Sequence, residues 1–139
     1  MKTATASTDA LDAREAGSLL AAEIQQGLGR KPQAIMIFAA PSYDHGALLD
    51  ELASQCPESI LVGASSAGEF VNQTQGEGLV CALGLAGEDV RFALGVARDI
   101  TADTCDAARQ IVSGFSGLSD FTFPHRSALV LADALAGHA

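Results

Sequence analysis

The sequence predicts an α/β fold with a mixed, mostly parallel β-sheet and flanking helices. Short apolar runs typical of buried strands, such as residues 34–40 (AIMIFAA), alternate along the chain with segments whose apolar residues recur every three or four positions. Loops of small and hydroxyl residues follow several of these runs, as they do at the carboxyl ends of strands in open α/β sheets. The expected order of elements is α-β-α-β-β-β-α-β, with three parallel strands and a central antiparallel hairpin.

The first expected helix covers residues 9–28 and follows a flexible tail over residues 1–8. Its apolar stripe repeats every four residues: Ala16, Leu20, Ile24 and Leu28. Gly27 and Gly29 end the helix, and Pro32 prevents its continuation into the strand predicted over residues 34–40.

A second helix is expected over residues 43–55, followed by a strand over residues 59–64. Either Ser42 or Asp44 can cap the amino end of this helix, and Pro57 follows its carboxyl end. Since a helix joins them, the strands over residues 34–40 and 59–64 should be parallel neighbours.

The second half of the chain predicts a hairpin, a helix and a last strand. Two β-rich runs, residues 78–85 and 90–97, flank the turn-like segment at residues 86–89. Thr101 or Asp103 opens the next helix. Its expected inward face consists of Ala108, Ile111, Val112, Phe115 and Leu118. The last expected strand covers residues 127–132 and completes the parallel set.

Length, charge and composition favour a single-domain protein that binds neither nucleic acid nor membrane. A chain of 139 residues suits one domain, expected over residues 9–139, and a net charge of −9 disfavours nucleic-acid binding. No apolar run reaches the ~20 residues of a membrane span, and no secretory signal is present at the start, so we expect a cytoplasmic protein. The three cysteines form no metal or disulfide motif and are expected to be small buried residues.

Three strand-end segments are the candidate binding site. They are PSYDHGALL from Pro41, GASSAGEF from Gly63, and the segment that begins at Asp133 after the last expected strand. Each combines small or hydroxyl residues with an acid, so that backbone N–H groups and side-chain oxygens can reach a ligand. This site requires the carboxyl ends of the three strands to lie side by side.

The chemistry of these loops allows several interpretations. Asp44 and Glu69 can receive the amino group of a ligand, while Ser65, Ser66 and loop N–H groups hold its carboxylate. Alternatively, Ser42 and Asp44 only cap a helix and Glu69 is solvated. Ser66 also lies in an A-x-S-x-G pattern resembling a nucleophile elbow, which leaves a serine hydrolase as a remote alternative. The candidate triad histidines His45, His125 and His138 carry no supporting motif, so the favoured reading is not an enzyme.

Four blocks of the chain, in this order, resemble the FIST N-terminal domain, a bacterial intracellular signal-transduction module. They are PSYDHGALLDEL, VGASSAGEF, EDVRFALGVARDITAD and LVLADALAG. The similarity extends from about Asp9 to Gly137. The chain departs from the family pattern at Ala64, where Cys is common, at Ser66, where Thr is common, and at Ala134, where Gly is common. Because the similarity extends to the end of the sequence given, the resemblance leads us to expect a truncated member, without the family's C-terminal partner domain.

The resemblance implies a sensory, ligand-binding role. Family ligands are amino-acid-like small molecules or, in some members, haem, for which His45 is the candidate ligand here. The implied partners are a histidine kinase or cyclic-dinucleotide enzyme and the missing C-terminal domain, with no nucleic acid or membrane. The implied site residues are Ser42, Tyr43, Asp44, Gly63, Ser65, Ser66, Gly68, Glu69, Asp133 and Gly137. The competing class is a protein-interaction or scaffold domain, or a fragment without independent activity.

Overall fold

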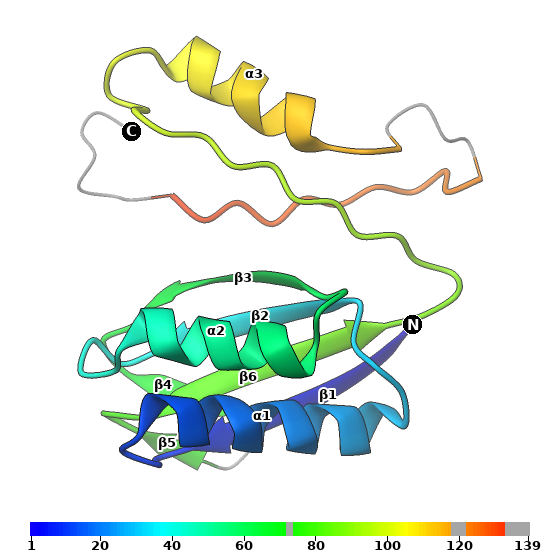
Figure 1. Cartoon of the computed structure of the whole chain (residues 1–139). Helices are drawn as coiled ribbons and strands as arrows, with labels where there is room; N and C mark the ends of the chain where they lie inside the picture. Colours follow the sequence, from blue (N-terminus) through cyan, green and yellow to red (C-terminus); the bar gives the residue numbers. More distant parts are fainter. Residues whose placement is uncertain (72–73, 118–121, 133–139) are drawn as a thin grey trace. The chain divides into compact units, whose positions relative to one another are not determined.

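The computed structural model describes residues 1–71, 74–117 and 122–132. The chain forms two compact units, Met1–Val90 and Arg91–Ala139. The first unit contains the sheet and the candidate site, and the second contains one helix and two extended segments (Figure 1).

A mixed four-stranded sheet forms the centre of the first unit, in the order β1-β6-β2-β3. The strands are β1 (Lys2–Thr8), β6 (Val80–Ala86), β2 (Ala34–Ala39) and β3 (Ile60–Ser65). Strand β6 is antiparallel to both of its neighbours, whereas β2 and β3 are parallel. The α/β class and the mixed sheet are therefore as predicted, but the arrangement of the strands differs.

Two predictions about the strands of this sheet are wrong. Residues 1–8 are not a flexible tail, because Lys2–Thr8 forms β1 and pairs along its whole length with β6. Residues 78–85 do not form a hairpin with residues 90–97, which have no assigned secondary structure. Strand β6 is largely buried, which suits a strand between two neighbours better than one arm of an exposed hairpin.

The predicted set of three parallel strands is reduced to one parallel pair. Residues 127–132 are extended but are not assigned as a strand. Apolar residues in a short run indicate an extended chain, but a strand also needs a hydrogen-bonded neighbour. Within the part of the chain that the structure describes, only β2 and β3 run in the same direction as neighbours.

The helices of the first unit begin and end where local chemistry favours it. Helix α1 (Ala13–Leu28) begins after Asp12, whose carboxylate accepts a hydrogen bond from the Glu15 amide at 2.8 Å. It ends at Gly29, which adopts a left-handed conformation with φ 67°. Helix α2 (His45–Gln55) begins after Asp44.

Both helices cover the same face of the sheet and contact each other (Figure 1). The apolar stripe predicted for α1 is buried as expected, and it packs with buried residues of α2 and the sheet. The largest fully buried side chains are Leu20, Ile24, Leu28, Ile35, Leu48, Leu52, Val80 and Cys56. Burial of these apolar side chains is the main stabilising contribution to the first unit.

A small two-stranded sheet lies between β3 and β6 in the sequence. It consists of β4 (Glu69–Val71) and β5 (Thr74–Gly76), paired antiparallel. Two strands here bring Glu69, at the start of β4, into register with Gly76, near the start of β6.

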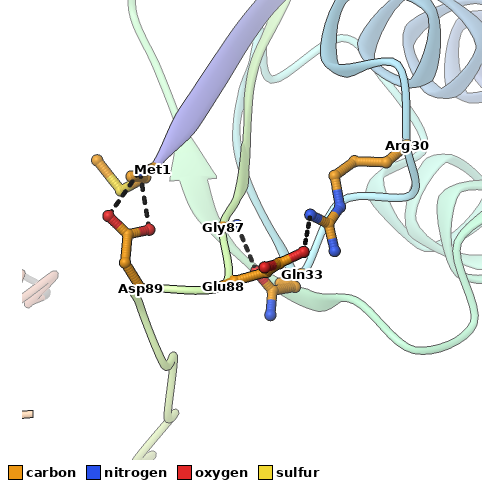
Figure 2. A network of polar contacts seen from close by, with 6 residues as sticks. All are labelled: Met1, Arg30, Gln33, Gly87, Glu88 and Asp89. Atoms are coloured by element: carbon orange, nitrogen blue, oxygen red, sulfur yellow. Dashed lines mark hydrogen bonds and ion pairs between the residues drawn. The ribbon is translucent and has the colours of Figure 1, made fainter.

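Polar contacts connect β1, β2 and β6 at the end of the sheet opposite the carboxyl end of β2 (Figure 2). The Gln33 side-chain oxygen accepts a hydrogen bond from the Gly87 amide at 2.7 Å. The Met1 ammonium donates to the Asp89 carboxylate at 2.8 Å and, through this hydrogen bond and its charge, lowers the pKa of Asp89. These contacts fix the register of β1 against β6 at this end.

The second unit contains α3 (Thr104–Gly114), which begins after Asp103 as one of the two predicted caps. Its predicted inward face is only partly confirmed. Ala107 is the buried residue, whereas Ala108 and Val112 are exposed and Ile111 and Phe115 are half-buried. Leu118 lies outside the described residues.

The extended segments of the second unit make specific contacts of their own. The Arg91 guanidinium lies 5.3 Å from the centre of the Phe123 ring, a cation–π geometry. The Arg98 amide donates to the Gln110 side chain at 3.4 Å, which attaches the first segment to α3. Of the cysteines, Cys56 and Cys81 are buried as predicted, but Cys105 on α3 is exposed.

Candidate functional site

The loops after β2 and β3 meet at one end of the sheet, together with the residues that lead into β6. Strand register places Ser65, the last residue of β3, opposite Ala39, the last residue of β2, and Ala39 opposite Val80. Two backbone hydrogen bonds extend this row into the loops. The Ser66 amide donates to the Ala39 carbonyl at 3.0 Å, and the Ala40 amide donates to the Leu79 carbonyl at 3.0 Å.

Tyr43 is the buried anchor of the loop after β2. Its side chain packs within the core cluster, and its amide donates to the Ala40 carbonyl at 3.2 Å. The phenolic hydroxyl donates to the Gly78 carbonyl at 3.4 Å, a long bond across to the segment before β6. Burial, with the negative charges of Asp9 and Glu69, raises the pKa of Tyr43, so the phenol is neutral.

Asp44 caps helix α2, and Ser42 does not. The Asp44 carboxylate accepts a hydrogen bond from the Ala47 amide at 3.0 Å, while Ser42 is exposed. The sequence had left the choice of cap open between them. Both side chains remain accessible at the surface of the loop, so capping occupies one carboxylate oxygen of Asp44 without burying the other.

His45, the candidate haem ligand, makes a hydrogen bond with one of its two ring nitrogens. Its Nε2 lies 3.1 Å from the Ala40 carbonyl oxygen, which can only accept, so this nitrogen carries the proton. The bond leaves Nδ1 as the unprotonated ring nitrogen. No group of three or more metal-ligating side chains occurs among the residues that the structure describes.

Glu69 is a buried carboxylate with two defined partners. Only 4% of the residue is exposed to solvent. The Ser66 hydroxyl donates to Oε1 at 2.5 Å, and the Leu79 amide donates to Oε2 at 3.0 Å. The reading in which Glu69 is a solvated loop residue is therefore wrong.

The charge of Glu69 reaches two neighbouring side chains. Burial and the nearby Glu69 carboxylate raise the pKa of the Cys81 thiol, and Glu69 also contributes to the raised pKa of Tyr43. In the described parts of the chain, no Lys, Arg or His forms an ion pair with Glu69. The carboxylate is instead held by neutral hydrogen-bond donors.

The remaining loop residues divide into packed and accessible positions. Gly63 faces the backbone of Ile37 so closely that a Cβ at position 63 would collide with the Ile37 carbonyl oxygen. A Cβ at Gly68 would lie 3.9 Å from the Gly76 carbonyl oxygen, an ordinary contact. Ser65 is exposed. Gly63 is thus explained by strand packing, while Ser65 presents a hydroxyl to solvent.

The structure brings together most of the predicted site residues, but in different roles. Ser42, Tyr43 and Asp44 follow β2, and Ser65 ends β3 at the same end of the sheet, with Ser66, Gly68 and Glu69 directly after it. Asp133 and Gly137, the predicted third loop, lie outside the described residues, as does His138. The separation of roles is clear for the two acids, since Asp44 caps α2 and Glu69 is buried against Leu79.

Sequence reasoning missed Leu79 and Cys81 as members of this region. Leu79 contributes through its backbone, and a backbone amide leaves no trace in the residue type. Cys81 was recognised as a strand residue, but its proximity to Glu69 depends on how the β4–β5 hairpin folds back. The one signal available in the sequence was an acid, Glu69, at the end of an otherwise small-residue loop.

Comparison with known families identifies one match. The sequence model of the FIST N domain matches residues 33–139, well over half of the chain, and crosses the boundary between the two compact units. No curated protein and no solved structure matches the chain. No described helix is long and apolar enough to span a membrane. The chain therefore belongs to the FIST N domain family, a family of sensory domains of signal-transduction proteins.

Proposed function

We propose that the chain senses a small, amino-acid-like ligand at the loops after β2 and β3. The observation that carries this proposal is the meeting of these loops at one end of the sheet, where the Ser66 amide bonds to the Ala39 carbonyl. Ligands of α/β sheets bind at the carboxyl ends of strands. Membership of a sensory family supports a sensing role.

The accessible groups of these loops define the class of ligand. Ser42 and Ser65 are exposed and can donate hydroxyl hydrogen bonds to a carboxylate. The exposed Asp44 carboxylate can accept from an ammonium group, because the Ala47 amide leaves part of its hydrogen-bonding capacity unused. A small zwitterion would satisfy both kinds of group. Binding would then act on a signalling partner such as a histidine kinase or cyclic-dinucleotide enzyme.

Hydrolysis by Ser66 is poorly supported. The Ser66 hydroxyl donates its hydrogen to the Glu69 carboxylate. Of the three candidate histidines, His45 is the nearest to Ser66 in the sequence, and its Nε2 is hydrogen-bonded to the Ala40 carbonyl oxygen. An activated serine nucleophile requires a base held in place by a third group. A ligand-binding role needs no such arrangement.

A thermal-shift screen tests the proposed function. The full chain is heated with each of the twenty amino acids, with small carboxylates and with haem, and ligand at a hundred times Kd is expected to add ~2.7 kcal/mol to the unfolding free energy. Ser65→Ala should abolish the shift, while Ser54→Ala, on the exposed surface of α2, should retain it. The absence of a shift with every compound would count against ligand sensing.

A second candidate function, protein interaction, is favoured by the apolar surface of the second unit. Several large apolar side chains there are exposed: Leu94, Val96, Ile100, Val112, Leu129, Val130 and Leu131. Contiguous exposed apolar patches mark sites of protein association. Size-exclusion chromatography of the full chain separates the two candidates, since a monomer over a wide concentration range would argue against self-association as its purpose.

A further inference from the structure

Four hydrogen bonds form a closed ring at the same end of the sheet as the candidate site. The Ala39 carbonyl accepts from the Ser66 amide, and the Ser66 hydroxyl donates to Glu69 Oε1. Glu69 Oε2 accepts from the Leu79 amide, and the Leu79 carbonyl accepts from the amide of Ala40. Since Ala39 and Ala40 are consecutive, the ring returns to its starting point. It connects the ends of β2 and β3 to the starts of β4 and β6.

Glu69 is the one side chain that joins the two halves of this ring. Its two oxygens belong to one rigid carboxylate, so a displacement of the atom that faces Ser66 also displaces the atom that faces Leu79. The residue is only 4% exposed, which means that water cannot readily replace a lost partner of its carboxylate. Hydrogen bonds in such a buried network depend on one another more than exposed ones do.

We propose that Glu69 is a positioning residue that couples the loop after β3 to the start of β6. A change at Ser66 is transmitted through the carboxylate to Leu79, thirteen residues further along the chain. Ser66 directly follows β3 and Leu79 directly precedes β6, and the two residues share no direct hydrogen bond among the described contacts.

Through this coupling, binding of a ligand at the loop after β3 could change the structure of the β4–β5 hairpin. Ser65, exposed beside Ser66, is the hydroxyl that the proposed ligand would meet first. A ligand that shifts this loop would pull on the Ser66–Glu69 bond and so reach the β4–β5 hairpin, whose first residue is Glu69. This last step rests on the function proposed above, whereas the ring itself does not.

Amide hydrogen exchange on the full chain tests the coupling. The measured quantity is the exchange rate of the Leu79 amide divided by that of Ile37 in the middle of β2, which corrects for overall stability. Ser66→Ala removes the hydroxyl but touches neither Leu79 nor its acceptor atom. We expect the ratio to rise about tenfold in this variant, because the freed carboxylate no longer holds the Leu79 amide in one geometry.

Three further variants complete the test. Glu69→Gln can keep both contacts, because its amide oxygen can accept from the Leu79 amide while its NH2 group donates to the Ser66 hydroxyl, so it should keep the natural ratio. Ser66→Thr retains a hydroxyl, and Ser65→Ala removes a neighbouring one outside the ring, so both should keep the natural ratio. A rise below threefold in Ser66→Ala would overturn the proposal.

The exchange experiment and the ligand screen test separate hypotheses, so a negative result in one does not imply a negative result in the other. Exchange is measured without any ligand, so the absence of a thermal shift with amino acids, carboxylates or haem leaves the exchange ratios unaffected. Conversely, an unchanged ratio in Ser66→Ala would remove the coupling while leaving Ser65 as a ligand contact. The two results therefore distinguish failure of the coupling from failure of the proposed function.

Discussion

Gly63 lies directly opposite Ile37 in the parallel pairing of β3 with β2, and a Cβ at position 63 would collide with the Ile37 carbonyl oxygen. Gly63→Ala should therefore separate the two strands locally and lower the unfolding free energy by about 1–3 kcal/mol, the usual cost of overpacking. Chemical denaturation of the natural and variant chains measures this difference.

Gly68→Ala is the matched control for that substitution. Its added methyl group would lie 3.9 Å from the nearest atom, the Gly76 carbonyl oxygen, and its backbone needs no left-handed conformation. The unfolding free energy should change by less than about 0.5 kcal/mol. Equal destabilisation by the two substitutions would show that the contact with Ile37 is not what requires glycine at position 63.

Leu52 on α2 is completely buried, whereas Leu49 on the same helix is 41% exposed. Leu52→Ala should lower the unfolding free energy by about 2–5 kcal/mol, because it removes buried apolar contacts and leaves a cavity. Leu49→Ala should cost less than about 0.5 kcal/mol. Urea denaturation monitored by circular dichroism compares them, and a similar cost for both would contradict the packing of α2 against α1 and the sheet.

The capping role of Asp44 can be separated from a role of its charge. Asp44→Ala should lower the unfolding free energy by about 1 kcal/mol, since the Ala47 amide loses its acceptor. Asp44→Asn keeps a capping oxygen without the charge and should be nearly neutral for stability. Asp50→Ala, on the exposed surface of the same helix, is the control. Thermal unfolding at neutral pH would refute capping if Asn destabilised as much as Ala.

Stability should fall on the alkaline side of neutrality. Burial is the main cause that raises the pKa of Cys56, Cys81 and Tyr43 in the folded chain. These groups stay protonated when folded, while the unfolded thiols and phenol lose protons near their ordinary values of 9.0 and 10.0. The unfolded state then binds fewer protons, so the unfolding free energy decreases as the pH rises.

Melting temperatures between pH 7 and pH 10.5 measure this effect. The decline should begin near the ordinary thiol pKa of 9.0 and steepen as tyrosine titrates. In a Cys56→Ala and Cys81→Ala double variant, the part of the decline that precedes tyrosine ionisation should diminish. A melting temperature that stays level up to pH 10.5 would be inconsistent with buried, protonated thiols.

The sequence predicted those helices and strands that have a clear pattern of apolar residues within their own segment. The four-residue apolar spacing from Ala16 to Leu28 identified α1, and compact apolar runs identified β2, β3 and β6. Strand β1 was missed because KTATAST lacks large apolar residues. Its small alanines, Ala4 and Ala6, suit the space beneath α1, and this fit is visible only once the helix is in place.

The sequence predicted where the two loops of the candidate site lie, but not the contacts that their side chains make. The loops at residues 41–49 and 63–70 were expected at neighbouring strand ends, and the parallel pairing of β2 with β3 places them there. The burial of Glu69 was not predictable, because it depends on a hydrogen bond from the backbone of Leu79. Residue type alone does not distinguish an acid that faces solvent from one that is enclosed by a hairpin.

The insertion of β6 between β1 and β2 has a consequence for biosynthesis. Strands β1 and β2 both pair with β6, so they cannot form these hydrogen bonds until the ribosome has released residues 80–86. Until then, one edge of β1 and one edge of β2 have unpaired backbone N–H and C=O groups. Long-range closure of this kind slows folding. We expect translation intermediates that stop before Val80 to be prone to aggregation and to need protection by chaperones.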